Sequence, residues 1–381
     1  MPPLPLLLSA GEASGDMYAA QLATALLKRL DVRLFGMGGP LMRAAGVEIV
    51  MDYEQVAVVG ITEILKHLPS LLRAMDNLVS TAVERKPALA ILTDFPGFHL
   101  RLARKLKPKG IRNVYYICPQ FWAWRPWRAK LIARRFEKAL CILPFEKQFF
   151  CNAGVSTEFI GHPLVGSVAA TKDRRAFCEQ HDLAPRSHLV AVLPGSRTSE
   201  LAHHLPVLQD ACARIDAKLP TQFVVAAANA KDVDALKSGW PSGLKIRVVA
   251  GETYNALAAA DAAIVSSGTA TVEAALLDAP MTVVYRVSPM TAALAKPLLR
   301  TPYYAMVNLI AEKRLVAELV QDAFTPQNVA TETLRLLQDP NARAAVRTGL
   351  AEVRQRLGPP GAVDRAADAI ASLLSPTGNA S

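Results

Sequence analysis

Residues 4–30, LPLLLSAGEASGDMYAAQLATALLKRL, carry the pattern on which the fold depends. An apolar run at 4–9 leads into a turn with two glycines, and helically spaced apolar residues follow at 17–30. A buried strand, a short turn and an amphipathic helix form the repeating unit of parallel α/β proteins. The glycines allow a tight bend and close approach of a ligand, and the start of the helix offers unpaired N–H groups.

The same unit recurs along the 381 residues, a length that corresponds to two domains at roughly 150 residues each. Two series of short apolar runs alternate with helical patterns and are joined near Gly161, His162 and Pro163. The predicted strands are 4–9, 33–35, 89–93, 113–117, 139–143 and 158–160, then 188–193, 222–226, 245–249, 262–265 and 281–285. The predicted helices include 17–30, 206–218, 270–277 and 326–337.

This alternation predicts an α/β fold of two Rossmann-like domains that face a central cleft. We expect the domains at residues 1–165 and 166–341, and we expect the last helices, about 342–375, to pack back on the first domain. Ligands of such sheets bind at the carboxyl ends of the strands. The polar residues that follow the predicted strands are therefore the candidates for a functional site.

The formal net charge of +10 favours an anionic partner: nucleic acid, a phosphorylated small molecule or an acidic membrane surface. Between Leu100 and Lys138 there are twelve Lys and Arg residues and one acid, so the positive charge is concentrated in the first half. The five cysteines form no C-x-x-C pair, which argues against a zinc site or a disulfide framework and favours a reduced, cytoplasmic setting. The opening apolar run lacks the features of a signal peptide, and no window approaches the ~20 apolar residues of a membrane span.

The turn after the first predicted strand contains Glu12, Ser14, Gly15 and Asp16. Its two carboxylates disfavour direct binding of a pyrophosphate, because like charges repel. They suit contacts to sugar hydroxyls, or the removal of a proton from a substrate. Alternatively, this is an ordinary turn in which Ser14 or Asp16 caps the helix that follows.

Another carboxylate, Asp94, ends a predicted strand in the stretch TDFPGFH, residues 93–99. Enzymes with α/β folds place reactive side chains at this position. Asp94 can therefore take the proton of an attacking hydroxyl as a general base. The alternative is a turn aspartate or a helix cap ahead of Pro96.

The stretch LPGSR, residues 193–197, follows the strand that opens the second series. A turn of glycine and serine that leads into a helix can hold a phosphate through N–H groups, and a guanidinium adds a charged contact. Ser196 and Arg197 are therefore candidates for a phosphate clamp. The alternative is a surface arginine after a turn.

The stretch SSGTATVE, residues 266–273, again joins a predicted strand to a helix. Ser267, Gly268 and Thr269 form a turn that can bind the distal part of a diphosphate. Glu273 lies one turn into the helix and can accept two hydrogen bonds from a ribose diol. The alternative for Glu273 is a first-turn glutamate that the helix dipole favours.

Three of the four tryptophans, Trp122, Trp124 and Trp127, lie beside a basic run that includes Arg128 and Arg134. Interleaved aromatic and basic residues can stack on bases or settle at a membrane interface. The alternative is that the tryptophans belong to the core beside a solvated basic face.

A stripe of apolar residues that includes Leu68 and Leu72 follows helical spacing over 61–79. This stripe can meet a membrane, or it can be the buried face of an ordinary amphipathic helix.

Nine short blocks follow one another along the chain between Ser9 and Glu273, and in this order they resemble the lipid-A-disaccharide synthase family, glycosyltransferase family 19. The resemblance extends from about Ser9 to Gln321. The blocks are SAGEASGD (9–16), GMGGP (36–40), GITEIL (60–65), DFPGF (94–98), WAWR (122–125), LPFEK (143–147), FIGHP (159–163), LPGSR (193–197) and SGTATVE (267–273).

The resemblance implies a GT-B fold and the transfer of a sugar from UDP-2,3-diacylglucosamine to 2,3-diacylglucosamine 1-phosphate. The products are the β(1′-6)-linked lipid A disaccharide 1-phosphate and UDP, and the change from an α-linked donor to a β-linked product inverts C1. The resemblance also implies functional positions for Asp94, Arg197 and Asn308. It aligns Glu12 and Asp16 with the family's first motif.

At His99 the family pattern has asparagine, so no role is carried over to that residue. We expect Asp94 to be the base, with Glu12 or Asp16 as the alternative. Preorganised donors can meet the charge of departing UDP, so we expect no metal and no other cofactor. Because both substrates carry acyl chains, we expect peripheral binding to the anionic cytoplasmic face of the inner membrane. We expect no nucleic-acid partner, since no RNA-binding motif is found.

Overall fold

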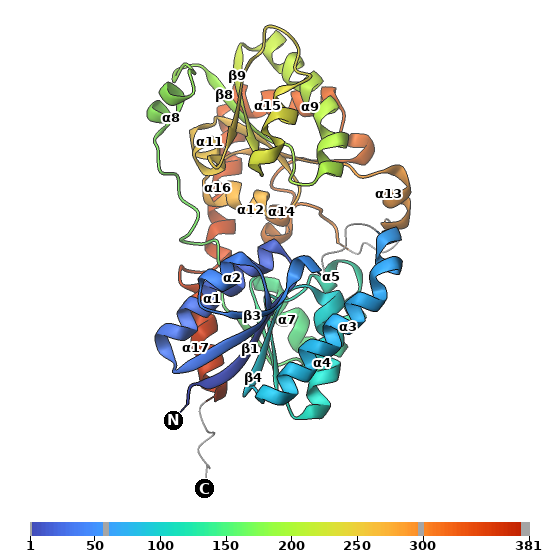
Figure 1. The fold of residues 1–381 in the computed structure, drawn as a ribbon. Helices are drawn as coiled ribbons and strands as arrows, with labels where there is room; N and C mark the ends of the chain where they lie inside the picture. The colour runs from blue at the N-terminus through green and yellow to red at the C-terminus, as the bar shows by residue number, and fades with distance from the viewer. Residues whose placement is uncertain (1, 56–60, 296–300, 375–381) are drawn as a thin grey trace. The chain divides into compact units, whose positions relative to one another are not determined.

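The computed structural model describes residues 2–55, 61–295 and 301–374, with side chains for all of these except 55, 61–71 and 294–295. The chain divides into two compact units: residues 1–163 with 358–381, and residues 164–357. Each unit contains a parallel sheet covered by helices, which confirms the predicted α/β class with two Rossmann-like units (Figure 1). The division after Pro163 lies close to the predicted boundary at 165.

The first unit contains a seven-stranded sheet in the order β3-β2-β1-β4-β5-β6-β7, with every pair parallel. Its strands are β1 (Leu4–Ala10), β2 (Val32–Gly38), β3 (Glu48–Asp52), β4 (Leu89–Thr93), β5 (Asn113–Tyr116), β6 (Lys138–Cys141) and β7 (Thr157–Phe159). Strands β1 and β4 are neighbours although they are not consecutive. The chain therefore leaves β1 toward one edge of the sheet and returns to build the other.

Helices cover both faces of this sheet. They are α1 (Ala13–Arg29), α2 (Pro40–Ala44), α3 (Ile61–Arg85), α4 (Pro96–Leu106), α5 (Phe121–Trp124), α6 (Ala129–Arg135), α7 (Pro144–Asn152) and α17 (Ala362–Leu374), with short 3₁₀ turns η1 (Tyr53–Gln55), η2 (Lys107–Lys109) and η3 (Pro126–Arg128). Figure 1 shows α3 and α4 on one side of the sheet and α1 and α17 on the other. Two apolar clusters of buried residues fill the two interfaces.

The last helix, α17, completes the first unit by packing on α1. Ile370 of α17 is fully buried in the cluster that contains α1. Ion pairs at the rim of the contact join Arg29 to Asp364 at 2.6 Å and to Asp368 at 3.1 Å. The Arg365 guanidinium also donates to the carbonyl of Ile160, beyond the end of β7.

The second unit contains a six-stranded parallel sheet in the order β10-β9-β8-β11-β12-β13. Its strands are β8 (His188–Leu193), β9 (Thr221–Ala227), β10 (Lys245–Ala250), β11 (Ala262–Ser266), β12 (Met281–Tyr285) and β13 (Glu318–Val320). Its helices are α8 (Arg174–Gln180), α9 (Thr198–Lys218), α10 (Val233–Lys237), α11 (Thr253–Ala259), α12 (Ala270–Leu276), α13 (Pro289–Ala295), α14 (Met306–Ala311), α15 (Pro326–Gln338) and α16 (Pro340–Arg356), with η4 (Ala230–Asp232) and η6 (Gln321–Ala323). The order again reverses, here between β8 and β11.

Helix α16 lies in the second unit, and only α17 packs on the first, so the expectation that both final helices return to the first domain is wrong for α16. Gly349 explains the close packing of α16, because a Cβ at this position would stand 2.0 Å from a methyl carbon of Leu315. Arg354 of α16 also donates to the carbonyl of Ala275, at the end of α12, and to Asp278.

Several elements differ from the sequence prediction. Helix α1 begins at Ala13 rather than at Met17, so Ser14, Gly15 and Asp16 lie inside it and not in the turn before it. Strand β3 is short and polar at both ends, and β13 has three residues, so neither shows an apolar run long enough to predict a strand. Helix α9 begins at Thr198 rather than at Pro206, which lies inside it. Proline removes one helical hydrogen bond and is expected at the first turn, but the packing of α9 tolerates it here.

We predict that Ile370→Ala destabilises the first unit by about 2–5 kcal/mol, because it leaves a cavity under α17. Differential scanning calorimetry should show the transition of this unit at a lower temperature. Leu27→Ala is the matched control, since Leu27 lies on α1 but is 39% exposed. Equal transitions for the two variants would mean that α17 contributes little to the stability of the first unit.

Candidate active site

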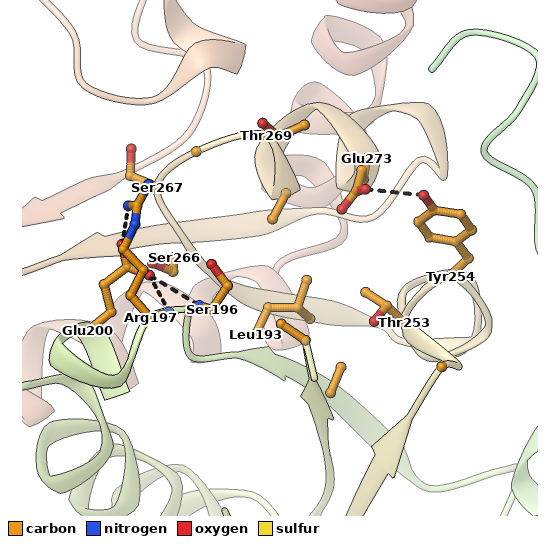
Figure 2. Close-up of a pocket in the computed structure, with 16 residues that line it drawn as sticks. Leu193, Ser196, Arg197, Glu200, Thr253, Tyr254, Ser266, Ser267, Thr269 and Glu273 are labelled. Carbon is orange, nitrogen blue, oxygen red and sulfur yellow. Dashed lines mark hydrogen bonds and ion pairs between the residues drawn. The ribbon is translucent and has the colours of Figure 1, made fainter. Parts of the chain in front are cut away.

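A pocket of about 510 Å³ opens in the second unit at the carboxyl ends of its strands. It is lined by the turns that follow β8, β10 and β11 and by the start of α12, and Figure 2 shows these residues. This is the point at which the strand order reverses, where α/β sheets bind their ligands. Six of the predicted substrate-binding residues line it: Ser196, Arg197, Ser267, Gly268, Thr269 and Glu273.

At one side of the pocket, the turn after β8 is organised by Glu200, which lies one turn into α9. The Glu200 carboxylate accepts hydrogen bonds from the main-chain N–H groups of Ser196 at 3.1 Å and Arg197 at 3.3 Å. It also pairs with the Arg197 guanidinium at 2.8 Å. Gly195 has φ +125°, and a Cβ there would meet Glu200 at 2.8 Å, so the close packing requires glycine.

These contacts change the expectation for the phosphate clamp. The N–H groups of Ser196 and Arg197, which we predict to hold a phosphate, donate to Glu200 in this structure. The Arg197 side chain remains 75% exposed and lines the pocket, so its guanidinium can still meet an anion. The sequence signal for Glu200 is an acid three residues after the helix start, which reaches back to the first N–H groups.

The turn after β11 leaves open space in the pocket. Gly268 has φ +144°, and apart from Gly268 itself and its two neighbours in the chain, no heavy atom of the described residues lies within 4 Å of the point where its Cβ would stand. Ser267 donates its hydroxyl to the carbonyl of Tyr304 at 3.1 Å, which anchors the turn, and Thr269 is exposed at the start of α12. The turn therefore leaves space beside its backbone, where we expect the diphosphate.

At the other side of the pocket, Glu273 accepts a hydrogen bond from the Tyr254 hydroxyl at 3.1 Å (Figure 2). Burial raises the pKa of Glu273. Burial and the nearby Glu273 raise the pKa of Tyr254 to about 12. Tyr254 was not among the predicted residues, although its place just after β10 is a sequence signal. The pair forms a partly buried group that can bind a diol.

Asn308 was predicted to bind substrate, but its side chain is fully buried and its hydrogen bonds are satisfied within the protein. Its amide nitrogen donates to the carbonyl of Val316 at 3.0 Å and to Glu318 at 2.8 Å. Its oxygen accepts from the N–H groups of Leu315 at 2.9 Å and Val316 at 3.0 Å. Asn308 therefore fixes the loop between α14 and β13, and we correct its role to a structural one.

In the first unit, Asp94 follows β4 at the corresponding reversal of strand order. Its side chain is partly buried, and burial, together with the nearby Glu12, raises the pKa of the carboxyl to about 7. Its carbonyl oxygen accepts hydrogen bonds from the Tyr115 hydroxyl and from Nδ1 of His99, each at 2.8 Å. A carboxyl with this pKa can accept a proton near neutral pH.

Asp16 was the alternative base, but its carboxylate is buried and holds the start of α2. One oxygen accepts from the N–H groups of Gly39 at 2.7 Å and Met42 at 3.2 Å, and the other accepts from the N–H group of Leu41 at 3.0 Å. Both oxygens are therefore occupied by main-chain donors at the start of α2. We correct the role of Asp16 to a helix cap.

The rest of this turn lies next to Asp94. Glu12 is exposed, and its Oε1 accepts from the Ser14 hydroxyl at 2.6 Å. A Cβ on Gly11 would overlap the Phe95 ring at 2.1 Å, which shows that the turns after β1 and β4 pack against each other. Gly15 is buried within α1. The structure thus brings Glu12, but not Asp16, to the Asp94 side chain.

The three predicted surface tryptophans differ in exposure. Trp122 is partly buried and donates from Nε1 to the buried Glu146 at 3.0 Å. Trp124 is partly buried beneath Arg125, whose guanidinium lies 4.6 Å from the ring centroid. Trp127 is 60% exposed. Glu146 was not among the predicted residues, although it lies in the LPFEK block.

Basic side chains gather on α4, η3 and α6 beside these aromatic residues. Burial and the charges of Arg125 and Arg101 lower the pKa of Arg128, and Arg134 is exposed. On the neighbouring helix α3, Leu72 is 43% exposed, whereas the side chain of Leu68 lies outside the described residues. We call Leu72, Trp127, Arg128 and Arg134 the aromatic-basic face.

No group of three or more His, Cys, Asp or Glu side chains among the described residues could hold a metal ion. No helix in them is long and apolar enough to cross a membrane.

Known structures share this fold at low identity. The calicheamicin glycosyltransferase CalG4 covers 99% of this chain and 100% of its own, with a TM-score of 0.62 at 19% identity. A putative UDP-N-acetylglucosamine 2-epimerase from Listeria monocytogenes covers 98% of this chain and 97% of its own, with a TM-score of 0.66 at 13% identity. These likenesses establish the GT-B type of fold, which glycosyltransferases and at least one putative epimerase share.

Sequence similarity decides the family. A family model described as lipid-A-disaccharide synthetase matches residues 6–366. A protein from Solibacter usitatus named lipid-A-disaccharide synthase is 44% identical, and the match covers 97% of each chain. The chain therefore belongs to the lipid-A-disaccharide synthase family and is a glycosyltransferase of lipid A biosynthesis.

Proposed function

We propose that the chain joins UDP-2,3-diacylglucosamine to O6 of 2,3-diacylglucosamine 1-phosphate. Family membership supports a UDP-sugar donor and a lipid acceptor, and the acyl pattern and linkage follow from the resemblance. The observation that supports the chemistry is Asp94, a partly buried carboxyl at the carboxyl end of β4 whose pKa is raised to about 7. Near neutral pH such a group is a stronger base than an ordinary carboxylate and is still substantially ionised.

The reaction is a single displacement at the donor C1. The acceptor oxygen forms a bond to C1 while Asp94 takes its proton, and the bond from C1 to the diphosphate breaks. UDP leaves with the electron pair, so the anomeric configuration is inverted. Glu12, which lies near Asp94, supports this assignment because its negative charge helps to raise the pKa of Asp94.

The pocket of the second unit is the proposed nucleotide site. Glu273 would accept hydrogen bonds from the ribose, and the turn from Ser267 to Thr269 would meet the diphosphate with main-chain N–H groups. Arg197 would add a charge-assisted contact. Because these donors compensate the charge that develops on UDP, we propose that no metal takes part.

We predict that Asp94→Asn lowers kcat by ~10²–10⁴, the usual range for loss of a general base, and leaves UDP affinity unchanged. The assay is UDP release with and without acylated acceptor, which also separates transfer from hydrolysis or epimerisation. In the wild type, kcat/KM should fall as pH drops through about 7, because protonated Asp94 cannot act as base. The variant should lose this dependence.

Asp31→Asn is the control for the Asp94 variant, since Asp31 is an exposed aspartate of the same unit. It should retain the wild-type rate and pH profile. Full activity of Asp94→Asn would exclude Asp94 as the base, and Glu12→Gln would then be the next variant to assay.

We predict that Glu273→Gln and Arg197→Ala weaken nucleotide binding in different ways, measured by titration calorimetry. Loss of a hydrogen bond to a charged group costs about 1.5–3 kcal/mol, or roughly 10–100-fold in Kd. Glu273→Gln should weaken both uridine and UDP, whereas Arg197→Ala should weaken UDP and spare uridine. Glu332→Gln on α15, outside the pocket lining, is the control. Unchanged UDP affinity in both variants would place the nucleotide site elsewhere.

We further propose that the aromatic-basic face of the first unit binds an anionic membrane, from which both acylated substrates are drawn. Each basic residue near such a surface contributes up to about 1 kcal/mol. Salt screens this attraction, because the Debye length falls from about 10 Å at 0.1 M to about 3 Å at 1 M. Insertion of Trp127 and Leu72, which are exposed apolar side chains, would not be screened.

We predict that the protein floats with anionic vesicles and that high salt reduces, but does not abolish, this binding. Arg128→Glu with Arg134→Glu should reduce the salt-sensitive part, and Leu72→Glu or Trp127→Glu should reduce the salt-resistant part. Leu27→Glu is the control, since Leu27 is 39% exposed on α1, at the other face of the sheet. Equal flotation of all variants would place the membrane contact elsewhere.

A further inference from the structure

His99 lies beside Asp94 in the first unit and has no role in the proposed reaction. Its ring is fully buried on α4, and both of its nitrogens have partners. Nδ1 lies 2.8 Å from the carbonyl oxygen of Asp94, and Nε2 lies 2.8 Å from the Ser9 hydroxyl, on β1. The ring therefore connects the first strand of the sheet to the residue proposed as base.

The partners determine the proton positions on the ring. A carbonyl oxygen can only accept, so Nδ1 of His99 carries a hydrogen and donates it to Asp94. Nε2 of the neutral ring must then accept from the Ser9 hydroxyl. Burial lowers the pKa of His99 to about 4, which keeps the ring neutral at physiological pH.

The ring is also fixed in orientation. Phe95 and Phe98 meet it edge-on, with ring centroids at 6.0 Å and 5.8 Å. A side chain held by two hydrogen bonds and two aromatic contacts has little freedom to rotate. It can therefore define the position of the carbonyl to which it donates.

The main chain at Asp94 needs such support. Asp94 and Phe95 have φ values of +45° and +47°, so two consecutive non-glycine residues lie in the left-handed region. This conformation is unfavourable for residues with a Cβ and persists only where the surroundings impose it. Two donors hold the carbonyl between them, the His99 ring and the Tyr115 hydroxyl at 2.8 Å.

We propose that His99 is a positioning residue for Asp94. Its ring bridges the Ser9 hydroxyl and the Asp94 carbonyl, and it thereby holds the left-handed turn that directs the carboxylate toward the acceptor. The inference rests on the proposed role of Asp94 as base. A histidine that only filled the core would need hydrogen-bond partners as well, but they would not have to include the main chain of the reactive residue.

Two isosteric variants separate the two hydrogen bonds. The Asn amide nitrogen reaches the position of Nδ1, so His99→Asn keeps the donor to Asp94 and loses the contact to Ser9. The Gln amide reaches the position of Nε2, so His99→Gln keeps the contact to Ser9 and loses the donor to Asp94. Tyr115→Phe removes the second donor to the same carbonyl with almost no change in volume.

We expect His99→Asn to retain most of kcat, and His99→Gln to lose ~10–100-fold, the size of effect that a misplacement of about 1 Å produces. Tyr115→Phe should lower kcat in the same direction. The KM for the donor and the Kd for UDP should stay unchanged in all three, because the proposed nucleotide site lies in the second unit. This split between kcat and KM is not expected of a general loss of folded protein.

The pH profile is the second readout. Burial and the charge of Glu12 raise the pKa of the Asp94 carboxyl, and a hydrogen bond from the Phe95 N–H lowers it. The titratable groups that the Asp94 charge reaches are Tyr115 of β5, Cys118 after it and Glu146 of α7. If the turn relaxes, the carboxyl becomes better hydrated, so the acid limb of kcat/KM should move below its wild-type position in His99→Gln. It should stay in place in His99→Asn.

The experiment distinguishes the two proposals. If Asp94→Asn loses turnover while His99→Gln and Tyr115→Phe keep the wild-type kcat and acid limb, Asp94 remains the base and His99 is only a core residue. If His99→Gln does not fold, Tyr115→Phe decides the same question, and a wild-type kcat and acid limb in that variant would overturn the positioning role. If Asp94→Asn is fully active, the proposed base fails and the positioning role fails with it.

Discussion

Parallel strands end at a common edge, and this constraint determines where chemistry can occur in both units. The chain leaves β1 toward β2 and β3 and returns to place β4 on the other side of β1, so the turns after β1 and β4 lie side by side at that edge. The same reversal occurs between β8 and β11. Right-handed crossovers leave few other arrangements, and ligands of such sheets bind at the reversal. Glu12 and Asp94 in one unit, and Arg197 and Gly268 in the other, owe their positions to this connectivity.

Hydrogen bonds from main-chain N–H groups occupy several of the carboxylates at these edges. Asp16 accepts three N–H groups, Glu200 accepts two and a guanidinium, and Glu146 accepts N–H groups of its own helix start and the Trp122 indole. Each of these carboxylates fixes a turn. Burial raises the pKa of the Glu146 carboxyl to about 7 in spite of these contacts. Burial and the like charge of Glu12 raise the pKa of Asp94, whose carboxyl accepts one main-chain hydrogen bond, from Phe95. Asp94, the proposed base, is thus a different residue from the carboxylates that hold these turns.

The sequence predicts the strands of both sheets well because β4, β8 and β12 are uninterrupted apolar runs with turns at each end. It also predicts which turns line the pocket of the second unit, because a residue's position after a strand can be recognised without knowledge of the packing. It does not predict that Asn308 and Asp16 are structural, because their partners are main-chain groups whose approach depends on the folded loops. Tyr254 and Tyr115 were missed for the same reason, as their partners Glu273 and Asp94 lie on other elements.

If Asp94 is the base, as proposed, the side chains that hold its turn must not lower the pKa of its carboxyl. A positively charged neighbour would hold the turn equally well, but it would stabilise the carboxylate and lower its pKa. Tyr115 and His99 supply donors without charge, and burial keeps both neutral by raising the pKa of the phenol and lowering that of the imidazole. Both donate to the carbonyl of Asp94 rather than to its carboxyl, so they restrain the main chain and leave the proton affinity of the side chain high. The contacts of the Asp94 carbonyl thus fix the position of this residue, whereas the surroundings of its carboxyl set the pKa.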